Sequence, residues 1–298
     1  MTKPFSVFAT LVSMCFAAAV SHAQPPQPSP ASPEYRATGE QSRTYSFPGT
    51  GESIPYHLYV PKSWSKNVRL PLVVVTHGAF QSAAAPFERP RAAPSLAKEA
   101  EKRGYIVVAV TGYHANATGV GGWNVPYKMV ALPRKPRPAG QTNAARRPRP
   151  QRARATAEDF TRAERDVLYV TDLVAEEYNV DPNRIYLMGN SSGGSAVWTY
   201  GAKYHERWAA ISPSAAPLED AAFPYDELKN VPVLYVQGDA DTVMSFAASE
   251  AMVKHAEAHG VDITWLPVPG GSHIDAWAQP QVLERTFDFF DAHVRAGR

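Results

Sequence analysis

The sequence predicts an α/β fold in which a mostly parallel central sheet carries helices on both faces. Continuous runs of β-branched and aromatic residues alternate with longer segments of helical periodicity, and this alternation is typical of βαβ crossovers. Runs that are apolar at nearly every position are expected for strands buried on both faces. With 298 residues, the chain is long enough to form one well-buried domain of this kind.

The expected elements follow one another along the chain. An antiparallel hairpin comes first, because residues 43–47 and 56–60 alternate apolar and polar side chains on either side of a Pro-Gly turn. The later strands are expected at 70–76, 105–110, 184–188, 208–213, 231–237 and 263–268. Helices are expected at 94–103, 157–178, 246–259 and 281–294, and a further helical segment begins at Ala196.

Residues 1–23 are expected to be a signal peptide. A basic start is followed by the mostly apolar run 5–20, and Ser21-His22-Ala23 offers small residues to a signal peptidase. The alternative is a membrane anchor, but the run is shorter than the roughly 20 residues that span a bilayer. Cleavage after Ala23 removes Cys15, the only cysteine. We therefore expect an exported protein, periplasmic or extracellular, without disulfides.

Two proline-rich segments adjoin or interrupt the expected domain. Residues 24–40 are expected to be a flexible linker, which leaves 41–298 as a single domain. Residues 133–155 contain eight Arg or Lys side chains and no acidic ones, so we expect a disordered insertion. A solvated loop, a gate or substrate-attracting segment, and a binding site for polyanions all remain open for it.

No feature of the chain points to a nucleic acid, a nucleotide or a metal. The formal net charge is only +2. The glycine-rich residues 189–194 lack the lysine of a phosphate-binding loop, and no His, Asp and Glu cluster has metal-ligand spacing. We therefore expect no cofactor, no metal, no nucleic acid and, after signal cleavage, no membrane anchor. The oligomeric state is left open.

The chemistry is expected at residues 189–194, Gly-Asn-Ser-Ser-Gly-Gly, which join an expected strand to an expected helix. In a Gly-x-Ser-x-Gly turn of this kind, the serine is held at strained backbone angles with its hydroxyl exposed above the sheet edge. Only the frame centred on Ser191 has glycine at both ends, so Ser191 rather than Ser192 is the expected nucleophile. The alternative is a purely structural glycine turn.

A serine hydroxyl is a weak nucleophile and needs a base, which a carboxylate usually orients. Asp241 and His273 follow Ser191 in the chain, and each comes just after an expected strand. Parallel sheets place their sites at that edge, so we expect these residues to meet there. Asp239 is the rival acid, and its alternative role is to stabilise a turn.

With these motifs, the chain resembles an α/β-hydrolase. The resemblance rests on His77-Gly78, the serine turn, Gly238-Asp239-Ala240-Asp241 and Gly270-Gly271-Ser272-His273. The stretch 166–187 is similar to secreted esterases of the polyhydroxybutyrate depolymerase and feruloyl esterase kind and to related predicted peptidases. The resemblance covers most of 55–295. It implies the α/β-hydrolase fold, with the acid at the second Asp of Gly-Asp-x-Asp and the base at His273.

The resemblance also implies two backbone amides that hold an oxyanion. One is the amide of Ser192, and the other follows His77-Gly78, at Ala79 or alternatively at Phe80. His77 itself is expected to be structural. Three aromatic residues flank the expected site and either bind an aromatic or polymeric ester or belong to the core. They are Phe80, Trp123 and Trp277.

The expected function is a secreted serine esterase that cleaves small-molecule or polymeric carboxylic esters through an acyl-enzyme intermediate. A single-domain serine peptidase on the same fold uses the same triad, so the triad does not decide between them. A third interpretation is a non-catalytic protein that holds polyanions through residues 133–155, and the complete triad argues against it.

Overall fold

The computed structural model describes residues 34–88, 96–113, 123, 125–133, 156–219, 222–274 and 277–296. The expected signal peptide, residues 24–33 of the expected linker and residues 134–155 of the expected insertion lie outside this part of the chain. Among the described residues, no helix is long and apolar enough to cross a membrane.

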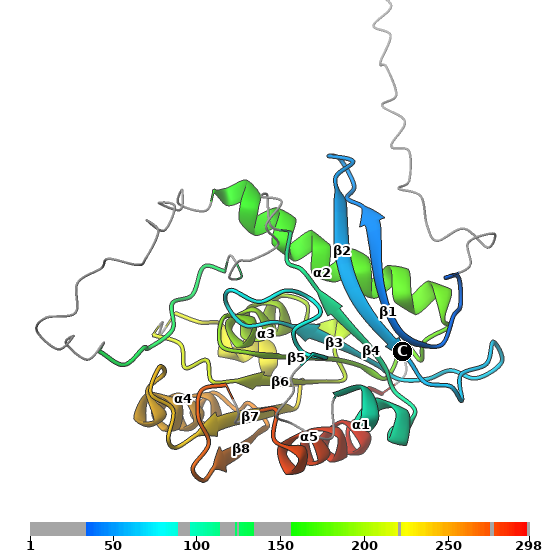
Figure 1. Ribbon diagram of the computed structural model, residues 1–298. Helices are drawn as coiled ribbons and strands as arrows, with labels where there is room; N and C mark the ends of the chain where they lie inside the picture. The colour runs from blue at the N-terminus through cyan, green and yellow to red at the C-terminus, as the bar shows by residue number, and fades with distance from the viewer. Residues whose placement is uncertain are drawn as a thin grey trace, which may run out of the picture.

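An eight-stranded sheet forms the centre of the described part of the molecule, in the order β1-β2-β4-β3-β5-β6-β7-β8 (Figure 1). The strands are β1 (Gly39–Ser46), β2 (Ser53–Val60), β3 (Leu72–Thr76), β4 (Ile106–Val110), β5 (Ile185–Asn190), β6 (Ala210–Ser214), β7 (Val233–Gly238) and β8 (Ile263–Val268). All pairings from β4 through β8 are parallel, whereas β1 pairs antiparallel with β2, and β2 with β4. The predicted sheet and N-terminal hairpin are confirmed.

The burial of each strand follows its sequence pattern. Every residue of β3, β4, β6 and β7 is buried, as the continuous apolar runs predict for strands covered on both faces. The hairpin alternates more strongly between buried and exposed positions. Its pairing runs from Ser46 opposite Ser53 to Gly39 opposite Val60, so β1 includes the last two residues of the segment 24–40 that was expected as a linker.

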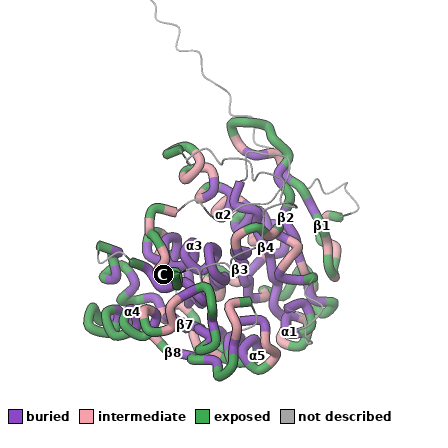
Figure 2. The backbone as a smooth tube through the Cα atoms, turned by 60° about the vertical axis from the view of Figure 1, so that its left-hand side comes forward, coloured by how far each residue is buried: buried purple, intermediate pink, exposed green. Residues whose placement is uncertain are grey.

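Helices cover both faces of the sheet. α1 (Leu96–Arg103) and α5 (Pro280–Ala292) share one apolar core with the sheet, and α2 (Ala157–Glu177), α3 (Ser192–Lys203) and α4 (Phe246–Ala258) share the core on the other face (Figure 1). Figure 2 shows the buried stretches running along the central strands, with exposed stretches on the loops and outer helix surfaces. This layering leaves the carboxyl ends of the parallel strands at one edge.

Local signals set the ends of two helices. α2 begins after Thr156, whose side chain accepts a hydrogen bond from the Asp159 amide at 3.2 Å, while the Asp159 carboxylate accepts one from the Thr156 amide at 2.7 Å. This reciprocal pair is a capping box. α4 ends just before Gly260, which has a φ of 79° and permits the chain to turn away.

Candidate active site

Ser191 lies at the turn between β5 and α3 with a strained backbone. Its φ is 59° and its ψ is −122°, a region that residues other than glycine rarely adopt. The Ser191 amide donates to the Ser214 carbonyl at the end of β6, at 2.9 Å. The neighbouring strand therefore holds the strained turn in place.

The glycines of this turn are required by the close approach of β3. Thr76 ends β3 and pairs with Gly189 in the parallel register. A Cβ atom on either Gly189 or Gly193 would overlap Thr76. The Thr76 hydroxyl also donates to the Gly193 carbonyl at 2.9 Å. Glycine at both ends of the serine turn thus lets the turn and the start of α3 pack directly on the end of β3.

Ser191, His273 and Asp241 form a hydrogen-bonded chain, referred to below as the Ser-His-Asp trio. The distance from His273 Nε2 to Ser191 Oγ is 2.9 Å, and that from His273 Nδ1 to Asp241 Oδ2 is 2.8 Å. Ser191 follows β5, His273 follows β8 and Asp241 follows β7. The carboxyl ends of these three strands lie at the same edge of the sheet. With Nδ1 donating to the carboxylate, Nε2 is the nitrogen that accepts from the serine hydroxyl.

The Asp241 carboxylate is anchored on both oxygens. Oδ1 accepts from the amides of Val243 at 2.7 Å and Met244 at 2.9 Å, and Oδ2 accepts from Gln237 Nε2 at 2.8 Å besides His273. Burial by itself raises the pKa of Asp241, but the hydrogen bonds from His273 and the two amides outweigh it and hold that pKa below its usual range. A negative charge is thereby held beside His273.

Gln237 was not singled out by sequence reasoning. It lies on β7 and is fully buried, and its Oε1 accepts from the Ser249 hydroxyl at 3.1 Å. The Ser249 hydroxyl is also 2.9 Å from the hydroxyl of Tyr235. The sequence signal that could have identified Gln237 is its amide side chain near the end of an otherwise apolar strand, two residues before Asp239.

Asp239, the rival acid, binds a backbone amide. Its Oδ1 accepts from the Gly270 amide at 2.7 Å, which links the loop after β7 to the loop after β8. A Cβ atom on Gly238 would overlap the Gly271 carbonyl, so these loops are in close contact. Asp239 thus stabilises a turn, and that contact brings the segments carrying Asp241 and His273 together.

The loop after β3 lies against the serine turn, where the oxyanion amides are expected. A Cβ atom on Gly78 would be 3.6 Å from the carbonyl oxygen of Asn190, the residue before Ser191. The Gly78 amide already donates to Gln81 Oε1 at 3.0 Å, so the next amide, that of Ala79, is the expected donor. Ser192 is the first residue of α3, where an amide has no acceptor within the helix.

His77 and Trp123 contact the backbone of this loop and of its neighbour. Both are buried, and the Trp123 indole donates to the His77 carbonyl at 2.8 Å. The His77 ring nitrogens lie 2.8 Å from the Gly78 carbonyl and 3.1 Å from the Thr111 carbonyl. Burial lowers the pKa of His77, although these two carbonyls act in the opposite direction. These contacts support the structural role expected for His77 and give Trp123 a positioning contact with the same loop.

The other two aromatic residues differ in exposure. Trp277 is buried in the core that α1 and α5 share with the sheet. Phe80 is exposed and has a φ of 63°, so the loop after β3 also contains a residue with a strained backbone. Of the three aromatic residues expected at the substrate, Phe80 is the one on the surface.

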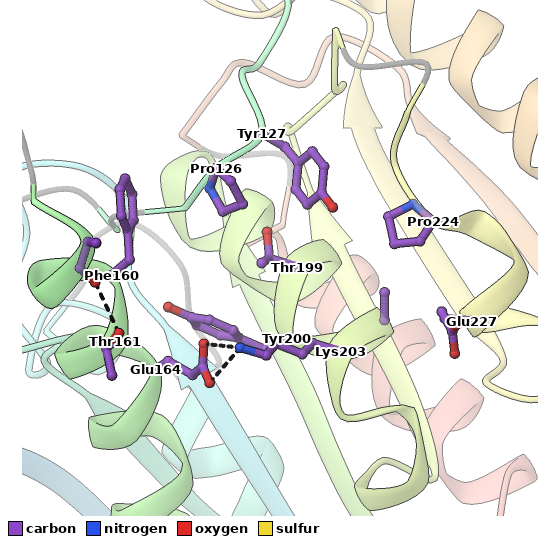
Figure 3. Close-up of a pocket in the computed structure, with 12 residues that line it drawn as sticks. Pro126, Tyr127, Phe160, Thr161, Glu164, Thr199, Tyr200, Lys203, Pro224 and Glu227 are labelled. Atoms are coloured by element: carbon purple, nitrogen blue, oxygen red, sulfur yellow. Dashed lines mark hydrogen bonds and ion pairs between the residues drawn. The ribbon is translucent and has the colours of Figure 1, made fainter.

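A cavity of about 640 Å³ lies apart from the trio, between α2 and α3 (Figure 3). Tyr127, Phe160 and Tyr200 line it, and the Lys203 ammonium lies 2.7 Å from the Glu164 carboxylate at its wall. None of the residues that line it belongs to the trio. Within the described residues, no group of three or more His, Cys, Asp or Glu side chains could hold a metal ion.

Comparison with solved structures identifies the fold. A thermostable esterase aligns with 86% of the chain at 21% identity and a TM-score of 0.55, and 63% of that structure is covered. The feruloyl esterase module of Clostridium thermocellum, solved with sinapinate, aligns with 91% of the chain at 14% identity and a TM-score of 0.58, with 95% of the module covered. The chain has the α/β-hydrolase fold.

Sequence comparison adds a short match. The bifunctional acetylxylan esterase/xylanase XynS20E of Neocallimastix patriciarum is 29% identical over 89 residues, which is 30% of this chain. The match spans 13% of that relative's length. No family model matches the chain. These likenesses establish the α/β-hydrolase fold.

Proposed function

We propose that this protein is a serine hydrolase that cleaves carboxylic esters. The observation that carries the proposal is the hydrogen-bonded chain Ser191–His273–Asp241, with distances of 2.9 and 2.8 Å, at the strained turn of an α/β-hydrolase fold. The esterases and feruloyl esterase among the structural neighbours support the ester as substrate. A small-molecule or polymeric ester fits the proposal equally well.

The first half of the reaction forms an acyl-enzyme. His273 Nε2 takes the hydroxyl proton as Ser191 Oγ attacks the ester carbonyl. The amides of Ser192 and Ala79 hold the resulting oxyanion, and each such donor contributes about 2.7–4 kcal/mol to transition-state stabilisation. The carbon–oxygen bond to the alcohol then breaks, and the alcohol leaves with the proton from His273. Asp241 stabilises the imidazolium throughout.

The second half releases the acid. Water gives a proton to His273 Nε2 and attacks the acyl carbonyl, and the tetrahedral intermediate again lies against the two amides. Collapse of that intermediate breaks the bond to Ser191 Oγ, which recovers its proton from His273. Apart from the ester and the water, every group that takes part in this cycle comes from the chain itself.

Fluorophosphonate labelling of the purified protein tests the proposal. Wild-type protein is expected to hydrolyse p-nitrophenyl acetate and to gain one label on Ser191. Ser191→Ala is expected to lose both, because the nucleophile is gone. Ser192→Ala is the matched control: its neighbouring hydroxyl is removed while the backbone amide stays, so labelling is expected to persist. Labelling of Ser191→Ala, or unchanged hydrolysis, would contradict the mechanism.

The preference for esters over amides needs its own measurement. The trio serves both reactions, so matched ester and amide substrates with the same acyl group are compared. Ester cleavage is expected to be faster, and preferential amide cleavage would indicate a peptidase.

Export is part of the proposal, with residues 1–23 as signal peptide. The mass of the mature protein is expected to match a chain that begins at Gln24.

A further inference from the structure

Exposed apolar side chains occur on the segments that carry the Ser-His-Asp trio and on segments bonded to them. Among the described residues, the large apolar side chains that are strongly exposed are Val68, Phe80, Leu132, Val243, Ile274 and Val294. Four of them belong to segments that build the site, and Val68 and Val294 do not. Scattered apolar residues on a surface need no explanation, whereas a group of them at one place marks a binding surface.

Each of the four either neighbours a site residue in the chain or is linked to the site by a backbone hydrogen bond. Ile274 directly follows His273, and Phe80 directly follows Ala79. The Val243 amide donates to the Asp241 carboxylate at 2.7 Å. The Leu132 amide in turn donates to the Val243 carbonyl at 2.8 Å, which sets these two residues side by side.

The backbone beneath Leu132 and Val243 is held by further hydrogen bonds. Ala131 forms an antiparallel bridge with Met244, and the Ser245 amide donates to the Val130 carbonyl at 3.1 Å. Leu132 and Val243 nevertheless remain 38% and 42% exposed. Both side chains are therefore exposed although hydrogen bonds hold their backbone in place beside Asp241.

The chemistry of this surface is aliphatic and uncharged. Three of the four side chains are aliphatic, and the two tryptophans that could have formed an aromatic platform, Trp123 and Trp277, are buried. None of the four carries a charge or a hydrogen-bonding group. Such a surface gains free energy by removing aliphatic groups from water, at about 0.8 kcal/mol for each buried CH₂.

We propose that Phe80, Leu132, Val243 and Ile274 form an apolar rim that binds an aliphatic chain of the ester substrate. This inference rests on the proposed esterase function and names the substrate class for that site. The rim binds the part of the acyl chain beyond its first carbons, so a longer aliphatic acyl chain raises kcat/KM. A short acyl group does not reach the rim and gains nothing from it.

The test compares p-nitrophenyl octanoate with p-nitrophenyl acetate, both below their solubility limits, in Val243→Thr and Ile274→Thr. These changes replace a methyl or ethyl group by a hydroxyl at exposed positions, and the Val243 amide that holds Asp241 is retained. The octanoate-to-acetate ratio of kcat/KM is expected to fall by about fourfold in each variant, because roughly one CH₂ contact is lost. Val68→Thr is the matched control, since Val68 is 44% exposed and lies outside the site. Its ratio is expected to equal that of the wild type.

The possible outcomes distinguish a failure of the rim proposal from a failure of the proposed esterase function. A wild-type protein that cleaves neither ester would overturn the esterase function itself. A protein that cleaves the acetate but prefers it to the octanoate would overturn the rim alone. The rim proposal is also overturned if the octanoate-to-acetate ratio of kcat/KM is unchanged in both Val243→Thr and Ile274→Thr, or if this ratio falls equally in Val68→Thr. A lower ratio in both rim variants, with an unchanged control, supports the proposal.

Discussion

Replacing Gln237 by methionine tests how the acid of the trio is held. Gln237 is fully buried, and its Nε2 donates to Asp241 Oδ2, the oxygen that also accepts from His273. Methionine has a similar length but no donor. The substitution therefore removes one of the four hydrogen bonds to this carboxylate and leaves the amides of Val243 and Met244 in place.

The expected loss follows from the energy of one hydrogen bond to a charged group. Such bonds contribute about 1.5–3 kcal/mol, and about 1.4 kcal/mol of transition-state free energy corresponds to a tenfold change in rate. Because two amides still anchor the other oxygen, we expect the lower end, about a tenfold decrease in kcat. KM is expected to change little, because Gln237 is buried beneath Asp241 and does not contact substrate.

The assay is steady-state hydrolysis of p-nitrophenyl acetate, together with urea unfolding to measure stability. Ser249→Ala is the control, because it removes the hydroxyl that donates to Gln237 Oε1 but keeps the Gln237 donor to Asp241. Both variants are expected to lose stability, by about 1–2 kcal/mol. Only Gln237→Met is expected to lose kcat by more than twofold. Equal kcat values in the two variants would refute a positioning role for Gln237.

Two further predictions concern the buried carboxylates. Asp241→Asn is expected to lower kcat by about 10⁴-fold, since the amide no longer stabilises the imidazolium, whereas Asp239→Asn, which affects only the turn at Gly270, costs less than tenfold. Kinetics that ranked the two variants in the opposite order would identify Asp239 as the acid. Burial raises the pKa of Asp166 to about 6, although hydrogen bonds from Tyr45 and the Gly112 amide act against it. Because this pKa is higher in the folded than in the unfolded state, the stability that Asp166 contributes is complete below about pH 4 and is lost as the pH rises through about 6. Urea unfolding should show the advantage of wild type over Asp166→Asn shrinking by about 3 kcal/mol between pH 4 and pH 7, and a constant difference would contradict the assigned pKa.

Short-range signals predicted most of the framework. The continuous apolar run of β3 predicts a strand buried on both faces, and all five of its residues are buried. The glycines around Ser191 predict a sharp turn, and Gly189 and Gly193 both make room for Thr76. In both cases, the cause lies in the residues of one segment: side-chain periodicity in the strand, and the absence of Cβ atoms in the turn.

Other features depend on contacts between distant segments. Arg43 lies on the face of the hairpin that buries Tyr45 and Phe47. The partner of its buried charge is Glu177, which lies 2.8 Å away and 134 positions later in the chain. For Trp123, the sequence left substrate binding and core packing open, and the side chain is buried against His77. A sequence pattern specifies which face of a strand or helix a side chain occupies, but not which neighbour covers that face.

The sequence by itself determined the parallel sheet, the strained serine turn and the order of Ser191, Asp241 and His273 along the chain, because periodicity and turn chemistry act within a few residues. Tertiary structure alone decided that these three side chains meet within hydrogen-bonding distance. It also decided that Gln237 anchors the acid and that Leu132 lies beside Val243. Those contacts join segments separated by loops, and their geometry arises only when the helices and strands pack around a common core.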